Sequence, residues 1–417
     1  QVKIPALRYR QMGNILNIIK SDKEFYELDK YVFMESGDGA FISDQIRKYF
    51  KVNLVDFKDT NEKEKYIYLI ETRESQGVMS AIHNIPNNII DMTNKNNCKI
   101  IISYESEGDL DIIEFNKFFY NSCVLLGKKL NFKNVYVFTG DVTCAEKNKT
   151  PINFFGSPHC LDSIAYDFNN AKNRNDKLEL SEFKYDFNVK TIDDIDIDNK
   201  SKYFLCYLRN CNRLHRKGLA AYFQYHDLWD TNNISWLKIS WSSGLPEYVP
   251  EKYWKSCFEL DEKPLLELDT HDLKNKGGFN TMFSSDWKHN QESFLTIVSE
   301  TQYEKDTTYI SEKMVKPIMN LQPFIVMTTP NFLQFLKDNG FKTFDGFINE
   351  SYDTQDNHEQ RFEMIFDELD KFRSKSFDEL KDWWKEILPI LEHNQNRLIE
   401  IGQQKTNKIK LLEKLYD

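Results

Sequence analysis

The segment from Phe294 to Pro330 carries residues that could bind a nucleotide. A run of buried-type residues ends in Ser299-Glu300, and after a polar loop the residues Ile310 to Lys313 open a helix that is expected to end near Gln322. The carboxylate of Glu312 could accept hydrogen bonds from a ribose diol. Lys313 and the N-terminus of the helix could bind a diphosphate. In the alternative interpretation, Ser311 and Glu312 only cap the helix and Lys313 is solvated.

A second segment, Phe204 to Ala220, places a cluster of cations after a hydrophobic strand. Five side chains that can carry positive charge fall within nine residues: Arg209, Arg213, His215, Arg216 and Lys217. Such a cluster repels itself unless an anion or carboxylates lie among its members, and arginine suits bidentate contact with phosphate. The alternative is a basic turn that faces water.

Three groups of acidic residues offer further chemistry. Glu105 ends the nearly apolar run Lys99–Glu105 and Glu107 follows it. One of the two could accept a proton from a hydroxyl group; the alternative is a solvated loop. The alternating aspartates of the sequence DDIDID and the pair Asp109 and Asp111 have the spacing of a divalent-metal motif. Because the DDIDID stretch lies in a polar linker and does not follow a strand, we interpret it as solvated and expect no metal site.

The elements that must position these residues alternate between strands and helices. In the first third, strands are expected at 30–35, 52–57, 65–70, 99–105 and 134–139, with a helix at 115–130. Residues 142–200 are polar, and a boundary is expected near Lys200. A second block has expected strands at 203–208, 236–241, 294–298 and 323–327, with helices at 216–224, 311–320 and 331–339. The remainder, from about His358, is expected to be helical.

This order predicts an α/β protein with two Rossmann-like parallel sheets that face a cleft, followed by a helical C-terminal tail. The predicted domains are an α/β domain at 1–200, in which 142–200 form a long polar excursion, a second α/β domain at 201–357, and a helical extension at 358–417. Ligands of open parallel sheets bind beyond the carboxyl ends of the strands, so the cleft between the two sheets is the predicted site.

Composition limits the function classes. The chain has 417 residues, 40% of them hydrophobic, and a formal net charge of −10, which disfavours binding of nucleic acid across a broad surface. Seven cysteines without a CxxC spacing indicate reduced thiols and no zinc site or disulfide framework. Neither a phosphate-binding P-loop motif nor GxGxxG is found, and no apolar run is long enough to span a membrane.

The nucleotide-binding segment resembles the donor-binding stretch of the α-1,3-fucosyltransferases. Tyr309, Glu312 and Lys313 match that family's pattern, Ser311 replaces its threonine, and Val298–Thr301 stands where the family has its strand end. The cationic segment matches more loosely, through Leu208-Arg209 and His215-Arg216, with Asn210 in place of a second arginine. The resemblance covers about residues 200–370. It extends to fucosyltransferase-like proteins of large DNA viruses, phages and bacteria, through residues 341–344 and 349–352.

The resemblance implies a GT-B glycosyltransferase that transfers fucose or a similar sugar from a nucleoside-diphosphate sugar to a hydroxyl acceptor, with inversion and without a metal ion or other cofactor. A GDP-sugar is favoured over a UDP-sugar. Glu107 or Glu105 would be the catalytic base. The implied donor-binding residues are Arg209, Arg213, His215, Arg216, Glu300, Tyr309, Ser311, Glu312 and Lys313. Glu304 lies before Glu312 at a spacing found in retaining enzymes, which we interpret as coincidence.

Other interpretations stay open at this stage. The Asn- and Lys-rich composition suggests an AT-rich, viral genome, and the expected location is cytoplasmic, in the host cytoplasm for a viral protein. The acceptor could be a glycan or, less favoured, a DNA base that the cationic tail Lys405–Lys414 helps to hold. A third alternative is a protein that binds carbohydrate or a partner without catalysis. The sequence does not indicate the oligomeric state.

Overall fold

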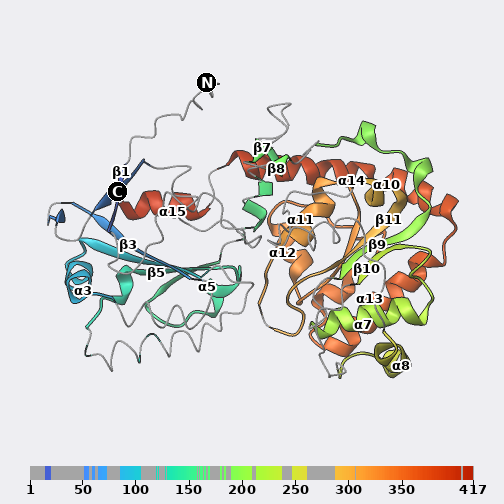
Figure 1. Cartoon of the computed structure of the whole chain (residues 1–417), viewed down its shortest axis with the longest axis horizontal. Coiled ribbons are helices and arrows are strands. Elements are labelled where there is room, and N and C mark those ends of the chain that lie inside the picture. The colour runs from blue at the N-terminus through green and yellow to red at the C-terminus, as the bar shows by residue number, and fades with distance from the viewer. Residues whose placement is uncertain are drawn as a thin grey trace. The chain divides into compact units, whose positions relative to one another are not determined.

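The structure is a computed structural model of the whole chain (Figure 1). The residues that it describes are 15–19, 51–55, 59–61, 64–72, 85–104, 119, 121, 127, 129–156, 158, 160–162, 164–165, 168–169, 179–180, 183–184, 189–208, 213–236, 247–260, 287–305, 307–404 and 407–416. The chain divides into two compact units. The first comprises residues 1–34, 39–157 and 405–417, and the second comprises residues 35–38 and 158–404.

The first unit contains a parallel sheet of six strands in the order β2-β1-β3-β4-β5-β6. Its strands are β1 (Ile15–Ile19), β2 (Lys51–Val55), β3 (Tyr66–Thr72), β4 (Cys98–Tyr104), β5 (Val135–Thr139) and β6 (Asn153–Gly156). Its helices include α3 (Asn87–Asn94), α5 (Cys144–Lys147), α15 (Asn407–Tyr416) and the 3₁₀ helix η2 (Phe132–Asn134). Central strands of a parallel sheet are covered on both faces, and Ile100, Ile101 and Ile102 of β4 are accordingly all buried.

The second unit contains a parallel sheet of four strands in the order β10-β9-β11-β12. Its strands are β9 (Lys202–Leu208), β10 (Asn233–Trp236), β11 (Ser293–Ser299) and β12 (Phe324–Met327), with a separate antiparallel pair, β7 (Glu179–Leu180) and β8 (Phe183–Lys184). Its helices include α7 (Leu214–Tyr225), α8 (Trp254–Phe258), α10 (Trp287–Glu292), α11 (Glu312–Met319), α12 (Phe332–Asp338), α13 (His358–Arg373) and α14 (Phe377–Gln403). Short 3₁₀ helices lie at η3 (Ile192–Asp194), η4 (Ile197–Asn199), η5 (Glu251–Tyr253) and η6 (Glu350–Thr354).

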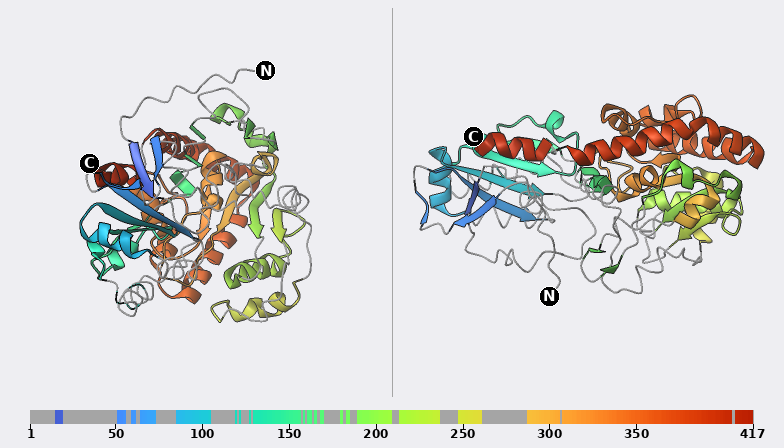
Figure 2. Two further views of the ribbon diagram at one scale, coloured as in Figure 1. Left: turned by 60° about the vertical axis from the view of Figure 1, so that its left-hand side comes forward. Right: turned by 90° about the horizontal axis from the view of Figure 1, so that it is seen from above.

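The strand order of the second sheet determines where its helices lie. The chain leaves β9 for β10 through α7 in one direction, and it leaves β11 for β12 through α11 in the other. Since crossovers between parallel strands are right-handed, the two helices cover opposite faces of the sheet (Figure 1). On the α7 side, α8 packs beside α7 (Figure 2). On the α11 side lies α14, where Gln395 donates a hydrogen bond to the carbonyl oxygen of Met319.

The long helices begin where the sequence supplies caps. Ser376 and Glu379 form a reciprocal capping box at the start of α14, and the side chain of Asn357 caps α13. Within α14 the residues Trp384, Ile387 and Leu391 recur at helical spacing and are buried. The helical nature expected from about His358 is therefore observed. However, α13 and α14 share the core of the second unit, while α15 belongs to the first.

The units divide between Ser157 and Pro158, whereas the sequence predicted a boundary near Lys200. The cause is an apolar face hidden in the polar excursion. Leu161, Ile164, Ala165 and Phe168 recur at i, i+3, i+4 and i+7 on a helical segment, and all four are buried in the core of the second unit. The isoleucines of the stretch Ile192–Ile197 also pack against this core, which anchors the acidic stretch to the second unit.

Most predicted strands correspond to observed ones within about two residues. However, β10 begins three residues before the predicted strand at 236–241, and β1, β6, β7 and β8 were not predicted. The predicted strand at 30–35 lies outside the described residues. So do positions 237–241 of the predicted strand at 236–241 and most of the predicted helix at 115–130. In the part of the chain that the structure describes, no helix is long and apolar enough to cross a bilayer.

Candidate functional site

The candidate site lies at the carboxyl edge of the second sheet, where the strand order reverses. From the neighbouring strands β9 and β11 the chain continues to α7 and α11, which lie on opposite faces of the sheet. Ligands of open parallel sheets bind beyond the carboxyl ends of the strands at such a reversal. The first turns of α7 and α11 both begin at this edge, and each presents the positive end of a helix dipole.

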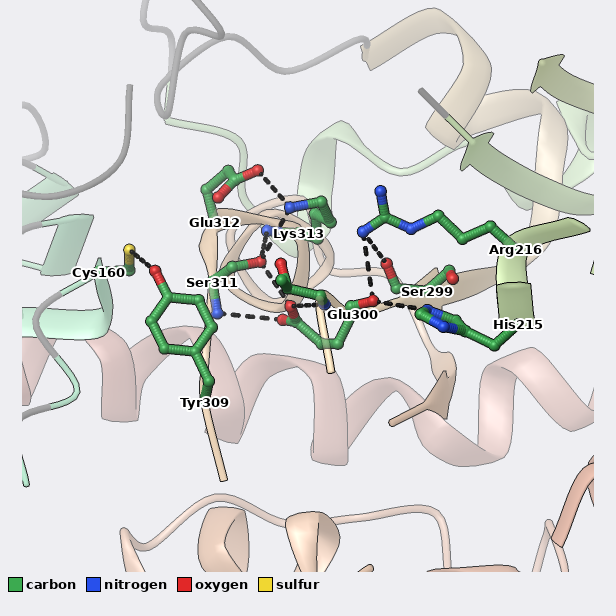
Figure 3. A network of polar contacts seen from close by, with 10 residues as sticks. Cys160, His215, Arg216, Ser299, Glu300, Tyr309, Ser311, Glu312 and Lys313 are labelled. Atoms are coloured by element: carbon green, nitrogen blue, oxygen red, sulfur yellow. Dashed lines mark hydrogen bonds and ion pairs between the residues drawn. The ribbon is translucent and has the colours of Figure 1, made fainter. Parts of the chain in front are cut away.

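The start of α11 is fixed by two buried side chains. Ser311 is the N-cap, and its hydroxyl oxygen accepts a hydrogen bond from the backbone N–H of Lys313. Glu300, at the end of β11, accepts a hydrogen bond from the hydroxyl of Ser311 at 2.7 Å and from its backbone N–H at 3.1 Å (Figure 3). Burial raises the pKa of Glu300, whereas Lys313 and Ser311 oppose that increase. Glu300 and Ser311 therefore join the strand to the helix. They are 0% and 1% exposed to solvent, respectively.

Glu312 and Lys313 form an ion pair on the first turn of α11. The Nζ of Lys313 lies 2.9 Å from Oε1 of Glu312 and 3.3 Å from Oγ of Ser311. Burial would raise the pKa of Glu312, but Lys313 and Lys316 outweigh it and hold that pKa at about 2, so the carboxylate is ionised near neutral pH. The side chain of Lys313 is 27% exposed and that of Glu312 only 5%, so the ammonium group is the accessible member of the pair.

The predicted cationic turn separates into buried and accessible members. His215 and Arg216 are buried at the start of α7 and reach across to the neighbouring strand. The Nε2 of His215 donates to the carbonyl oxygen of Glu300 at 2.8 Å, and Nη2 of Arg216 donates to the carbonyl oxygens of Ser299 and Glu300 at 3.2 Å (Figure 3). These two side chains therefore hold the backbone of the site together, and they do not face solvent as a cationic surface would.

Burial, followed by the charges of Arg216, Arg213 and Arg361, holds the pKa of His215 well below its usual value of 6.5. A neutral imidazole has one N–H, and the bond to Glu300 places it on Nε2. Arg213 is the half-buried N-cap of α7, and its side chain does not cap that helix. No acidic residue lies in the first turn of α7, so this helix terminus retains its positive character.

Ser299 adds a polar group at the same edge that the sequence analysis did not assign a role. It ends β11, is 2% exposed, and its hydroxyl has no hydrogen-bond partner among the described residues. Buried hydroxyl groups are normally hydrogen-bonded, so one without a partner marks a place where a ligand or water would be accommodated. The signal in the sequence was its position at the end of an apolar strand.

Tyr309 lies in the loop just before α11. Its ring is buried, and its hydroxyl lies 3.5 Å from Sγ of Cys160, on the helical segment that sequence analysis had taken for a polar excursion (Figure 3). Burial raises the pKa of the Cys160 thiol, so the sulfur stays protonated and acts as a packing group. The predicted contact of Tyr309 with a ligand stays a prediction.

The loop between β11 and α11 is held by side chains that were not predicted. The hydroxyl groups of Thr328 and Thr329, just after β12, donate to the carbonyl oxygens of Gln302 and Thr307. Arg361 of α13 donates to the carbonyl oxygen of Tyr303. Arg361 lies on the same helical face as Phe362, Ile365 and Leu369, all buried, and this position of an arginine within an apolar stripe was the available signal.

Several predicted residues are not located by the structure. Glu105 and Glu107, the candidate catalytic bases, lie outside the described residues, as do Arg209 and Asn210 of the cationic turn. Their assignments remain predictions.

The acidic stretch at 193–198 has structural roles. Asp194 accepts hydrogen bonds from the backbone N–H and the hydroxyl of Thr191, and Asp196 caps the turn that contains Asp198. Among the described residues, no group of three or more His, Cys, Asp or Glu side chains is arranged to hold a metal ion. Glu304, whose spacing to Glu312 resembled that of retaining enzymes, accepts a hydrogen bond from the hydroxyl of Tyr248.

No protein-family model matches the chain, and no curated protein matches it. The function must therefore be inferred from the arrangement of its own residues.

Proposed function

We propose that the chain is a glycosyltransferase of the GT-B type, which transfers fucose or a similar sugar from a nucleoside-diphosphate sugar to a hydroxyl acceptor. The observation that carries the proposal is the Glu312–Lys313 pair on the first turn of α11, beside the reversal of strand order between β9 and β11. An ionised carboxylate that can accept from a diol stands there next to an accessible ammonium group and a helix N-terminus. A nucleoside diphosphate has the complementary groups.

Two units, each with a parallel sheet, support the same proposal. GT-B enzymes combine two such α/β domains with a helical C-terminus, and this chain has two parallel sheets followed by α13, α14 and α15. The resemblance of Tyr309, Glu312 and Lys313 to the fucosyltransferase pattern adds the expected donor, a GDP-sugar in preference to a UDP-sugar.

The roles of the donor residues follow from exposure and charge. Lys313 and Arg213 are partly exposed, whereas Glu312 is as buried as Arg216 and is assigned to the ribose because its carboxylate is ionised. Lys313, Arg213 and the N-terminus of α7 would bind the diphosphate, together with Arg209 if that prediction holds, and Glu312 would bind the ribose. His215, Arg216, Glu300 and Ser311, which form hydrogen bonds within the protein, would hold these groups in place. Cations already positioned around the departing diphosphate would stabilise its developing charge, which is the basis for proposing transfer without a metal ion.

The acceptor side of the reaction rests on Glu105 and Glu107. An inverting transfer needs one carboxylate to remove the proton of the attacking hydroxyl group. The nucleoside diphosphate leaves from the opposite side of the anomeric carbon. Either glutamate would supply that base, and replacing each with glutamine would identify which one is required for turnover.

The test is thermal unfolding with GDP, UDP, ADP and CDP, each with and without Mg²⁺. A ligand that binds only the folded state stabilises it by about 2.7 kcal/mol at a hundred times its dissociation constant. We expect GDP to raise the midpoint most, without a requirement for Mg²⁺. Lys313→Ala should abolish the shift. Lys337→Ala, a half-exposed lysine of α12 paired with Glu350, is the matched control and should leave the shift intact. If no nucleoside diphosphate raises the midpoint, the proposed function is wrong.

A further inference from the structure

Arg361 is a buried cation that the proposed function does not use. It lies in the first turn of α13 and is 1% exposed. Its guanidinium group donates to the carbonyl oxygens of Gln355 and Tyr303 and to Nδ1 of His358. Among the described residues it forms no ion pair with a carboxylate. Arginine is rarely buried without such a partner because desolvation of the charge is costly, so the position needs a reason.

The contacts of Arg361 converge on Tyr303, in the loop between β11 and α11. The guanidinium carbon lies 4.3 Å from the centre of the Tyr303 ring, a cation–π distance. The hydroxyl of Tyr303 donates to the carbonyl oxygen of His358, in the same turn of α13. The ring, the hydroxyl and the carbonyl group of Tyr303 are thus all held by α13.

Tyr303 connects these contacts to the candidate site. Its ring stacks on the imidazole of His215, with centres 5.4 Å apart and planes 19° from parallel. His215 in turn donates to the carbonyl oxygen of Glu300, whose carboxylate joins β11 to the start of α11. A continuous series of contacts therefore leads from Arg361, through Tyr303 and His215, to the residues that orient Lys313.

We propose that Arg361 is a positioning residue of the proposed nucleotide site, which acts through Tyr303 and His215 on the backbone that ends β11 and begins α11. This inference rests on the proposed function. Arg361 does not contact the ligand. The N–H groups of its guanidinium hold the loop between β11 and α11 in place. That loop in turn positions the first turn of α11, which contains Glu312 and Lys313.

The planar guanidinium group of arginine carries several N–H donors in a fixed arrangement and can stack on an aromatic ring, whereas the ammonium group of lysine can do neither. The informative variant is therefore Arg361→Lys, which keeps the charge and loses the fixed arrangement of donors. The matched control is Arg373→Lys, the same substitution near the other end of α13, where the arginine contacts Asp370 and His226. Tyr303→Phe, a milder change, keeps the ring but removes the hydroxyl group that donates to His358, and it serves if Arg361→Lys does not fold.

Two measurements distinguish a positioning role from a general contribution to stability. The first is amide hydrogen exchange of residues 300–313, and the second is the dissociation constant for GDP. Both are made at a temperature at which every variant is folded. In Arg361→Lys we expect faster exchange in that segment and binding weaker by about tenfold or more, the size of effect that outer-shell contacts have at metal sites. Tyr303→Phe should show the same changes to a smaller extent, and Arg373→Lys should show neither. Exchange and affinity like those of Arg373→Lys in both test variants would overturn the role of Arg361.

The two proposals can fail separately. If the wild-type protein binds none of the nucleoside diphosphates, the proposed function is wrong and Arg361 positions no nucleotide site. If the wild type binds GDP and the Arg361 and Tyr303 variants bind it equally well, only the positioning role is wrong.

Discussion

Nε2 of His215 lies 2.8 Å from the carbonyl oxygen of Glu300, so the first turn of α7 is bonded directly to the end of β11. These two elements lie on either side of the reversal in strand order at which a ligand of such a sheet binds. The bond therefore stabilises the geometry of the site as well as the fold. It also makes the site sensitive to the protonation of one buried imidazole.

Replacing His215 with phenylalanine should remove a part of the acid sensitivity of the protein. The pKa of His215 is lowered in the folded state, so below pH 6.5 the unfolded state binds the proton more readily, and stability falls as pH decreases from that value. His215→Phe retains a ring to stack on Tyr303 but loses the hydrogen bond, at a cost of about 1–3 kcal/mol near pH 7.5. Urea denaturation from pH 7.5 to 5 should show the difference between wild type and variant shrinking as pH falls. A constant difference would contradict the assignment of a buried, neutral imidazole.

Replacing Glu312 with glutamine should destabilise the protein near neutral pH and have little effect on its stability in acid. The pKa of Glu312 is about 2, below its ordinary value of 4.5, so its charge stabilises the folded state above pH 4.5 and that stabilisation disappears as pH falls toward 2. We expect the variant to be less stable at pH 7 by about 2–3 kcal/mol and to approach the wild type in acid. Unfolding by urea between pH 7 and 3 measures this. A difference that grows in acid would show that the ion pair with Lys313 does not hold the carboxylate ionised.

The sequence predicted the strand and helix ends at the candidate site better than the side-chain contacts between them. Apolar strands followed by polar residues located Ser299, Glu300 and the start of α11, because carboxyl ends of parallel strands share one edge. That His215 and Arg216 would bind backbone carbonyl groups could not be predicted, since it depends on β9 and β11 being neighbours in the sheet. The same applies to Cys160, which reaches Tyr309 from a segment 149 residues away in sequence. The residues proposed as catalytic bases stay predictions.

Lys200→Met should change how the stability of the protein depends on pH, because the amine of Lys200 is buried at the edge of the second sheet opposite the candidate site. Lys200 is 2% exposed; its Nζ donates to the carbonyl oxygens of Asn290 and Ser293 and lies 3.9 Å from the centre of the Trp384 ring. Burial lowers its pKa well below 10.5, so the unfolded state takes up the proton more readily and stability rises with pH toward 10.5.

The methionine variant should lack that increase and lie within about 1–2 kcal/mol of the wild type at pH 7, because an apolar side chain often replaces a buried charge at little cost. The control is Lys202→Met, two residues away, whose lysine is 31% exposed and pairs with Glu292. Urea denaturation between pH 7 and 10 should show the wild-type slope in the control and a smaller slope in Lys200→Met. Equal slopes in the two variants would refute a depressed pKa at Lys200.

Gly402→Ala should destabilise the protein although it replaces glycine with a better helix former. Within helices alanine is favoured over glycine by about 1 kcal/mol. At Gly402, however, an added Cβ atom would lie 2.0 Å from the carbonyl oxygen of Ala165, on the helical segment that packs against the end of α14. Backbone atoms cannot move aside as a flexible side chain can, so we expect a loss of about 1–3 kcal/mol or more from overpacking.

Asn396→Ala, at an exposed position of α14, provides the comparison, since it should change the free energy of unfolding by less than about 0.7 kcal/mol and in the stabilising direction. Urea denaturation of both variants at pH 7.5 compares them with the wild type. We expect Gly402→Ala to lower the free energy of unfolding and Asn396→Ala to raise it. These opposite signs are expected only if α14 and the segment at 160–169 approach closely at Gly402. That close approach also assigns residues 158–169 to the second unit, so an increase in stability from Gly402→Ala would contradict the division of the chain at Ser157.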